Sequence, residues 1–251
     1  MKIVLLASGE VGSQVAKYLA TKKESIACLG IHSKERKNHK QKIKRYLKMN
    51  RNKVIILSKK ISKEKLKKIR AVKPDYILVI FWPHLLPENL IGAAKKGCIN
   101  LHIGYLPYNR GKNANVWPII NQTPAGVSMH FIDKSIDGGR VVSQIKVKTY
   151  ITDDGKTLYD RLIKNCLPLF KKTWKKIKEN KLRGKKQRLS KGSIHYSKDF
   201  KKLNCINLNK KVYPLDLFNQ LRAKKFLPFP LPYFFYKGKK VEIDLNLKLK
   251  S

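Results

Sequence analysis

The sequence predicts an α/β protein with an open, mostly parallel sheet that carries helices on both faces. The chain begins with a continuously apolar run at 2–7, followed by a glycine-bearing turn and by apolar residues at helical spacing. Apolar runs of strand length return at 25–31, 54–57 and 76–80, with stretches of helical length between them. Continuous apolar strands that alternate with helices indicate βαβ crossovers and a sheet covered on both sides, which is a Rossmann-like architecture.

The first turn, at 8–13, holds only a fragment of the Gly-x-Gly-x-x-Gly fingerprint, because Ala7 stands at the first glycine position. No acidic residue closes the next strand at the expected place, which argues against dinucleotide binding. We expect this turn to form the first crossover of the sheet and to offer backbone N–H groups to a substrate cleft.

The later elements follow from the same patterns. Charged residues dominate 33–53 and predict a surface helix with a narrow apolar stripe. Ser62 is a suitable N-cap for an amphipathic helix at 62–72. The pattern then predicts helices at 90–96 and 157–179, with a break or kink at Pro168, and strands at 125–132 and 141–147.

Composition bounds the class of protein. The 251 residues suffice for one α/β domain and a small appendage, and 42% hydrophobic residues support an ordinary core. No apolar run is long enough to cross a bilayer, and the short run at 2–7 indicates a strand rather than a signal peptide. Because Cys28, Cys98, Cys166 and Cys205 stand far apart, we expect neither disulfides nor a metal site, and a reducing, cytoplasmic location.

The net charge of +41 comes mostly from lysine, which supplies 47 of the 57 basic residues and is spread over the whole chain. Basic surfaces can bind nucleic acid or anionic membranes. Lysine without interleaved arginine and aromatic residues does not indicate dedicated nucleic-acid binding, however. We therefore expect solvated lysine-rich faces, no specific nucleic acid and no membrane, and a field that attracts a phosphate-bearing substrate.

Residues 98–140 carry the candidate chemistry. If 99–102 is a strand, alternation puts Asn100 and His102 on one face, and Asp137 arrives later on a turn flanked by glycines. An amide and an imidazole can both donate to a developing oxyanion, and a carboxylate can orient and charge the imidazole. These groups suit formyl or acyl transfer to an amine. An isolated Asn-x-His pair is more often a turn cap and a satisfied polar residue in a buried strand.

The residues around these groups resemble the signature of the folate-dependent formyltransferases. They are Asn100-x-His102, the Tyr-Leu-Pro turn at 105–107, Arg110-Gly111 and the Ile-Asp-Gly-Gly turn at 136–139. The resemblance covers most of residues 1–180. The loop LPYNRGKNANVW is most similar to that of the nucleotide-sugar N-formyltransferases, and it lacks the second arginine and the Ala-Pro pair usual in the methionyl-tRNA branch.

The resemblance implies 10-formyltetrahydrofolate as the formyl donor, no metal, and Asn100, His102 and Asp137 as catalytic residues. Asp133 competes with Asp137 for the role of the carboxylate. The pterin ring of the folate would lie against the run that follows the strand at 76–80, for which a plain hydrophobic hinge is the alternative. The expected folate contacts are Phe81, Trp82, Leu85, Leu86, Asp133 and Ile136.

The loop after His102 is the expected substrate site. Arginine and lysine suit a pyrophosphate, and aromatic side chains can stack on a base or a sugar. The expected substrate contacts are Tyr105, Tyr108, Asn109, Arg110, Lys112 and Trp117. The substrate implied by the resemblance is a nucleoside-diphosphate-linked amino sugar, such as a dTDP-4-amino-4,6-dideoxyhexose, used for surface polysaccharides such as the lipopolysaccharide O-antigen.

Two alternative functions remain open. The first is methionyl-tRNA formyltransferase, against which the tail of about 60 residues is short for a complete tRNA-binding domain. The second is a basic RNA-binding protein on an inactive α/β scaffold, against which the intact Asn-x-His and Asp-Gly pairing argues.

We expect three parts in the chain: a catalytic domain at 1–180, a basic linker at 181–192 and a small α+β appendage at 193–251. Every second residue from Val241 to Leu249 is apolar, which predicts a strand with one buried face. With a partner strand at 233–236 it would form a hairpin. An isolated hairpin is marginal in water, so we expect it to pack against a second copy of the chain in a homodimer, the alternative being its own domain.

Overall fold

The computed structural model of the chain describes residues 1–250. They form two compact units, each assembled from separate stretches of the chain. The first unit comprises 1–102, 128–143 and 166–187, and the second comprises 103–127, 144–165 and the residues from Arg188 onward. The Asn100, His102 and Asp137 positions all belong to the first unit.

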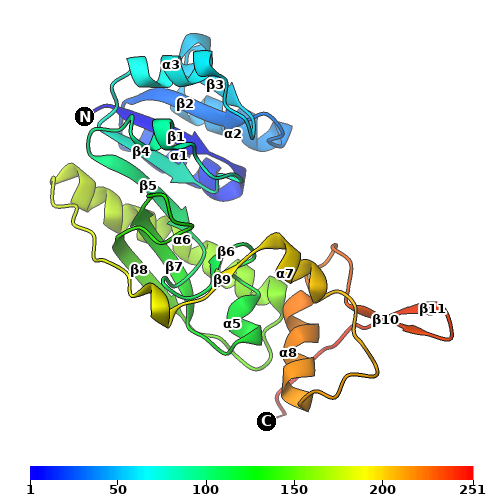
Figure 1. Ribbon diagram of the computed structural model, residues 1–251. Helices are drawn as coiled ribbons and strands as arrows, with labels where there is room; N and C mark the ends of the chain where they lie inside the picture. The colour runs from blue at the N-terminus through cyan, green and yellow to red at the C-terminus, as the bar shows by residue number, and fades with distance from the viewer. Residues whose placement is uncertain (251) are drawn as a thin grey trace. The chain divides into compact units, whose positions relative to one another are not determined.

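A seven-stranded sheet confirms the predicted mostly parallel architecture (Figure 1). Its strand order is β3-β2-β1-β4-β5-β7-β8. The pairings from β3 to β5 are parallel, whereas β5 and β7 are antiparallel. The strands are β1 (Ile3–Ala7), β2 (Ile26–His32), β3 (Val54–Leu57), β4 (Tyr76–Ile80), β5 (Gly97–His102), β7 (Ala125–Phe131) and β8 (Val141–Val147).

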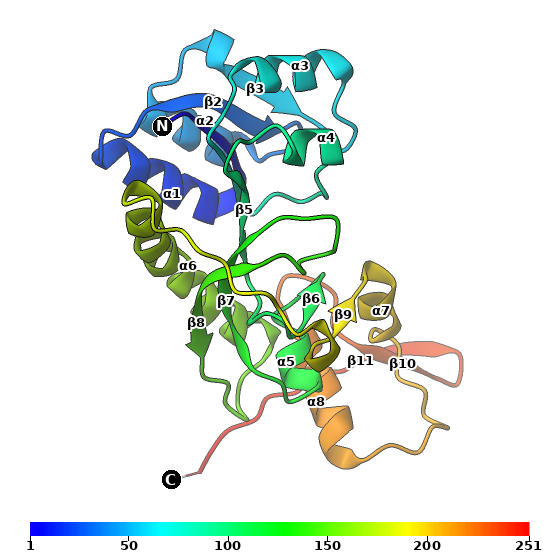
Figure 2. The same ribbon diagram turned by 60° about the vertical axis from the view of Figure 1, so that its left-hand side comes forward.

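Helices cover both faces of this sheet within the first unit. Figure 2 shows α1 and α6 on one side of the strands and α3 and α4 on the other. On the first side, the Tyr18 ring meets the Phe170 ring edge to face, and the Trp174 indole N–H donates to the Glu24 carboxylate at 3.1 Å. The helices are α1 (Gly9–Thr21), α2 (Lys37–Leu47), α3 (Lys63–Ala71), α4 (Glu88–Ile91) and α6 (Gly155–Lys178), with a 3-10 turn at Arg51–Lys53.

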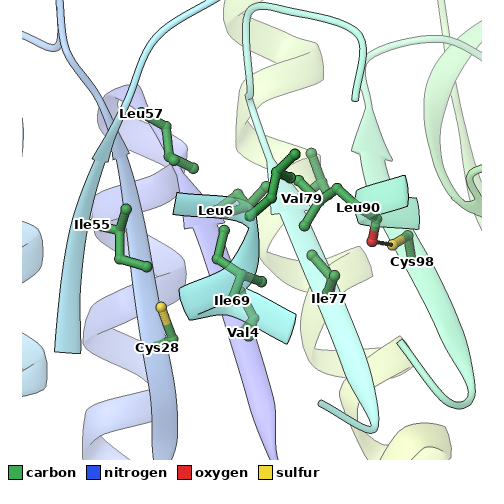
Figure 3. Packing of buried hydrophobic residues seen from close by; sticks show 11 residues of the cluster. Val4, Leu6, Cys28, Ile55, Leu57, Ile69, Ile77, Val79, Leu90 and Cys98 are labelled. Carbon is green, nitrogen blue, oxygen red and sulfur yellow. Dashed lines mark hydrogen bonds between the residues drawn. The ribbon is translucent and has the colours of Figure 1, made fainter. Parts of the chain in front are cut away.

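The core on the α3 and α4 side is built from alternate residues of the parallel strands (Figure 3). Leu66, Ile69 and Leu90 of the two helices pack there on Val4, Leu6, Ile55, Leu57, Ile77 and Val79. The Cys28 and Cys98 thiols lie in the same cluster, and burial raises their pKa values to about 11 and about 12. Such thiols stay protonated and pack as small apolar groups.

At the N-terminus of α1, where we expected N–H groups for a substrate, the Gly9 N–H is bound within the protein. The Gly9 N–H donates to the Glu35 carboxylate at 3.1 Å, and the Ser8 hydroxyl donates to the same oxygen. His39 lies 3.3 Å from the other Glu35 oxygen. A carboxylate of the protein itself therefore occupies the position where a substrate anion would bind.

Helix α6 runs through Pro168 without interruption, so the predicted break is absent. Cys166 is fully buried in this helix, and burial raises its pKa to about 12. The helix carries Leu158 and Leu162 in the second unit and Leu169, Phe170 and Trp174 in the first, all of them buried. A proline inside a helix removes one backbone N–H donor. Here the buried apolar residues on both sides of Pro168 keep the helix continuous.

The second unit is organised around α8 (Pro214–Lys224). The Arg222 guanidinium of this helix is buried and donates to the carbonyl oxygens of Tyr150 and Asp153, at 3.1 and 2.7 Å. The other elements of the second unit are β6 (Arg110–Gly111), α5 (Trp117–Ile120), a 3-10 turn at Leu189–Lys191, β9 (Ile194–His195), α7 (Ser197–Lys202), β10 (Tyr233–Tyr236) and β11 (Lys239–Glu242). Strands β6 and β9 pair in parallel.

Strands β10 and β11 confirm the predicted hairpin, with Lys237 and Gly238 at φ +46° and +74° in its turn. The second strand is shorter than the alternation predicted, because it ends at Glu242 and residues 243–250 form no regular structure. Four cross-strand pairs use all of β10, and beyond them the Ile243 N–H donates to the Pro232 carbonyl oxygen at 2.8 Å.

Candidate functional site

Strand β5 places Asn100 and His102 as the alternation predicts. The antiparallel pairing with β7 puts His130 opposite Asn100 and Ser128 opposite His102. His102 is buried, with 8% of its surface exposed, at the carboxyl end of β5. Open α/β sheets bind their ligands at this edge, so both predicted side chains stand where a site is expected.

The Asp137 carboxylate completes the predicted group of three. One of its oxygens lies 3.7 Å from Nδ1 of His102, and the other lies 3.5 Å from Nε2 of His130. The side chain is 17% exposed. The Asp137 backbone has φ +49°, a left-handed conformation that non-glycine residues adopt at some energetic cost. This conformation belongs to the turn that brings the carboxylate to the two imidazoles.

His130 is part of the site, and our sequence reasoning missed it. Its Nδ1–H donates to the Phe131 carbonyl oxygen at 2.8 Å, and its Nε2 lies 3.2 Å from the Asn100 side-chain nitrogen. The alternation of the 125–131 segment puts His130 on one face of its strand, but only the pairing register shows that Asn100 lies across from it.

Asp133 does not join this group. It is exposed, and one of its carboxylate oxygens accepts hydrogen bonds from the backbone N–H and the hydroxyl of Ser135. This is a local turn of the kind that aspartate commonly forms. Ile136 is half-buried in the same turn.

The run after β4 begins beside β5, the strand that carries Asn100 and His102, because Ile80 pairs with Leu101. Trp82 and Leu86 pack partly buried against the core cluster, whereas Leu85 is 73% exposed. Phe81 is half-buried and has φ +55°. His84 follows in the same run, with its Nε2 3.0 Å from Nε2 of His32, and the Trp82 ring meets the His32 ring edge to face.

The expected substrate residues lie together in the second unit. The Arg110 N–H and the Lys112 N–H donate to the Ser193 and His195 carbonyl oxygens, so the loop is tied to β9. The Arg110 Nε atom is buried and has no hydrogen-bond partner within residues 1–250. Tyr105 packs its ring against Gly126, and Tyr108 is half-buried.

Two of these loop residues are buried and stabilise the loop. Asn109 is fully buried, and its amide donates to the Thr123 hydroxyl at 2.8 Å. Trp117 is 5% exposed; its indole N–H donates to the Lys112 carbonyl oxygen at 2.7 Å, and its ring stacks on the His195 ring at 3.9 Å. Burial lowers the pKa of His195, and the nearby Asp199 only partly offsets this.

The described part of the chain has no group of three or more His, Cys, Asp or Glu side chains arranged to hold a metal ion. Within residues 1–250 we also find no helix with the length and apolar character needed to span a membrane.

The fold and the site together define a class of protein. An α/β enzyme that sets an amide, an imidazole and a carboxylate at the carboxyl end of a central strand is equipped for group transfer through an oxyanion. The chain belongs to the formyl transferase family: the family described as "Formyl transferase" matches residues 1–168, and "N-formyltransferase dimerization C-terminal domain" matches residues 199–249.

Solved structures extend this similarity over the whole chain. A 4-N formyltransferase from Francisella tularensis is 25% identical with a TM-score of 0.84, covering 99% of this chain and 98% of its own. The formyltransferase PseJ from Anoxybacillus kamchatkensis was solved in complex with UDP-4,6-dideoxy-4-formamido-L-AltNAc and tetrahydrofolate. It is 26% identical with a TM-score of 0.60, over 80% of this chain and 89% of its own.

A curated relative carries a different name. The methionyl-tRNA formyltransferase of Thermodesulfovibrio yellowstonii is 30% identical over 183 residues, which is 71% of this chain. The chain spans only 56% of the length of that relative.

Proposed function

We propose that this protein transfers a formyl group from 10-formyltetrahydrofolate to the amine of a nucleotide-linked amino sugar. The observation that carries the proposal is the convergence of Asn100, His102 and Asp137 at the end of β5, in the region that matches the formyl transferase family. The similarity to PseJ, which was solved with a UDP-linked formamido sugar, supports an amino sugar as the acceptor.

The chain's own residues have distinct tasks in this reaction. The Asn100 amide and the protonated His102 imidazole donate hydrogen bonds to the oxyanion that forms when the amine adds to the formyl carbon. Asp137 stabilises the charged imidazole and accepts the amine proton, directly or through water. The bound folate supplies the formyl carbon and its leaving nitrogen.

The run after β4 fits a folate on chemical grounds. Trp82 presents an aromatic ring, and Leu85 leaves an apolar side chain 73% exposed, beside the strand that carries Asn100 and His102. A flat pterin needs such apolar walls together with backbone hydrogen bonds. We therefore retain Phe81, Trp82, Leu85 and Leu86 as folate contacts, with the turn of Asp133 and Ile136 contributing backbone.

Arg110 is the residue that we propose for the diphosphate of the sugar substrate. Its buried, unpartnered Nε is a guanidinium donor already desolvated and available to an anion. Lys112 adds a second cation, while Tyr105 and Tyr108 offer rings to the base or the sugar. Asn109 and Trp117 hold the loop, since their polar atoms are engaged inside the protein.

We also propose a homodimer formed through the C-terminal region. Residues 199–249 match a family described as a dimerization domain, and this region leaves many large apolar side chains exposed. Exposed apolar patches of this kind commonly mark protein interfaces. They include Leu208, Tyr213, Leu227, Phe229, Phe235, Tyr236 and Leu249, each more than half exposed. The setting we propose is surface-polysaccharide synthesis in the cytoplasm, where the four free cysteines stay reduced.

Methionyl-tRNA is the second candidate acceptor, because curated relatives with 26–30% identity bear that name and the charge of +41 suits tRNA. One experiment separates the two. The pure protein is incubated with 10-formyltetrahydrofolate and a panel of dTDP- and UDP-linked amino sugars or methionyl-tRNA, and the products are weighed by mass spectrometry.

We expect a mass gain of one formyl group on an amino sugar, and no gain with the His102→Ala variant. Formylation of methionyl-tRNA alone would assign the protein to the other branch. No formylation of any acceptor would refute the proposal.

A further inference from the structure

The segment at 181–187, which its composition marks as a linker, is bound to the first unit beside the catalytic turn. Lys185 and Val141 exchange two backbone hydrogen bonds of 2.8 Å. A Cβ on Gly184 would come within 2.7 Å of the Arg140 Cβ and 3.0 Å of the Phe131 ring. These contacts fix the backbone just before the residue that lies two positions after Lys185.

That residue is Gln187. Its side-chain NH₂ group donates to the Asp137 carbonyl oxygen at 2.9 Å and to the Gly139 carbonyl oxygen at 2.6 Å. A glutamine amide has two N–H donors, and both are used on one turn. The amide oxygen is buried and makes no hydrogen bond within the described residues, so the two N–H donors alone set the orientation of the group.

The turn depends on such a clamp. Asp137 holds φ +49°, which an L-residue adopts at a cost, and such conformations persist only where the surroundings enforce them. The Gly139 backbone packs so closely against that of Phe131 that a Cβ at position 139 would lie 1.9 Å from the Phe131 carbonyl oxygen. Two contacts therefore hold the turn: Gly139 packs against Phe131, and the Gln187 amide binds the turn's carbonyl oxygens.

We infer that Gln187 is a positioning residue for the formyl transfer: its amide fixes the Asp137 backbone and so holds the carboxylate at His102. The inference rests on the proposed function. Gln187 touches neither substrate in this role, and it acts through the position of Asp137. A carboxylate displaced by about 1 Å loses much of its effect on a reaction that depends on geometry.

The test is a double-mutant cycle with Gln187→Met and Asp137→Asn. Methionine keeps the volume of glutamine and removes both donors. We expect Gln187→Met alone to lower kcat about tenfold, with KM for folate and sugar within about twofold, as for an interaction that matters in the transition state. In the Asp137→Asn background the same change should lower kcat less than about twofold, because the carboxylate that it positions is gone.

The matched control is Lys186→Met, which places the same side chain on an exposed neighbour and should leave kcat unchanged. An equal loss of kcat in the wild-type and Asp137→Asn backgrounds would overturn the inference and leave Gln187 as a structural residue. An unchanged kcat in Gln187→Met alone would also overturn it.

A second measurement does not need activity. The His102 imidazole, titrated by NMR, should lose its proton at lower pH in Gln187→Met than in the wild type, in the same direction as in Asp137→Asn. His130 flanks the same carboxylate and is followed in the same spectra. If the wild type formylates nothing but this movement occurs, the positioning stands and the proposed reaction fails. An unmoved His102 titration refutes the positioning.

Discussion

Replacing Asp137 by asparagine removes one charge from the site and keeps the size of the side chain. Two unit charges separated by the 3.7 Å between the Asp137 oxygen and Nδ1 of His102 interact by about 4.5 kcal/mol at an effective dielectric constant of about 20. The carboxylate is 17% exposed, so solvent screening reduces this to about 3 kcal/mol. Each 1.4 kcal/mol changes a rate about tenfold, and we therefore expect kcat to fall by about two orders of magnitude.

Steady-state kinetics over a pH series measures this effect. Because the uncompensated imidazole holds its proton less tightly, the remaining activity of Asp137→Asn should peak at lower pH than that of the wild type. Asp133→Asn is the matched control: Asp133 is exposed and bound to Ser135, so its loss should change kcat by less than about twofold. If Asp137→Asn kept a third of the activity, or if Asp133→Asn were the inactive variant, our assignment of the carboxylate would be refuted.

Three further predictions concern binding, assembly and stability. Arg110→Ala should raise KM for the nucleotide sugar about tenfold or more and leave KM for folate within about twofold, whereas equal effects on both would mean that the loop only supports the site. Phe235→Ser with Tyr236→Ser should turn the proposed dimer into a monomer in sedimentation at micromolar concentration; a wild type that is already monomeric contradicts the dimer. Burial lowers the pKa of Lys224 from 10.5 to about 8, so stability should rise with pH across that window, in which the unfolded chain binds more protons than the folded one. The ammonium also lies 3.5 Å from the centre of the Phe200 ring, which offsets part of the cost of its burial. Lys224→Met should therefore raise the free energy of unfolding by only about 1 kcal/mol at pH 7, or Tm by about 2–4 °C, and should have no effect above about pH 10.5. A lower Tm of the variant at pH 7 would contradict this.

The sequence predicted the features that depend on short-range patterns. Continuous apolar strands, a strand that presents Asn100 and His102 on one face, and the turn glycine of the C-terminal hairpin all follow from spacing within a few residues. The family resemblance supplied Asp137, whose position depends on chain folding over more than thirty residues. Alternation at 243–249 was misleading, because a strand needs a partner strand and β10 begins only at Tyr233, opposite Glu242.

The features that the sequence did not predict depend on contacts between distant segments. Glu35 reaches the N-terminus of α1 from another loop and fills it, and nothing in the local pattern marks that carboxylate. Gln187 stands in a stretch with the lysine and glycine content of a linker, yet it binds a turn fifty residues earlier. Such a role becomes visible only when the backbone carbonyls of that turn are placed beside it.

His130 connects the Asn100 amide to the Asp137 carboxylate. The Phe131 carbonyl can only accept a hydrogen bond, so Nδ1 of His130 donates to it. Nε2 of the same ring lies 3.2 Å from the Asn100 side-chain nitrogen and 3.5 Å from an Asp137 oxygen. The contact with Nε2 orients the Asn100 amide, and its N–H groups serve the oxyanion of the proposed reaction. The residue that our sequence reasoning missed thus sets the direction of the amide that it identified.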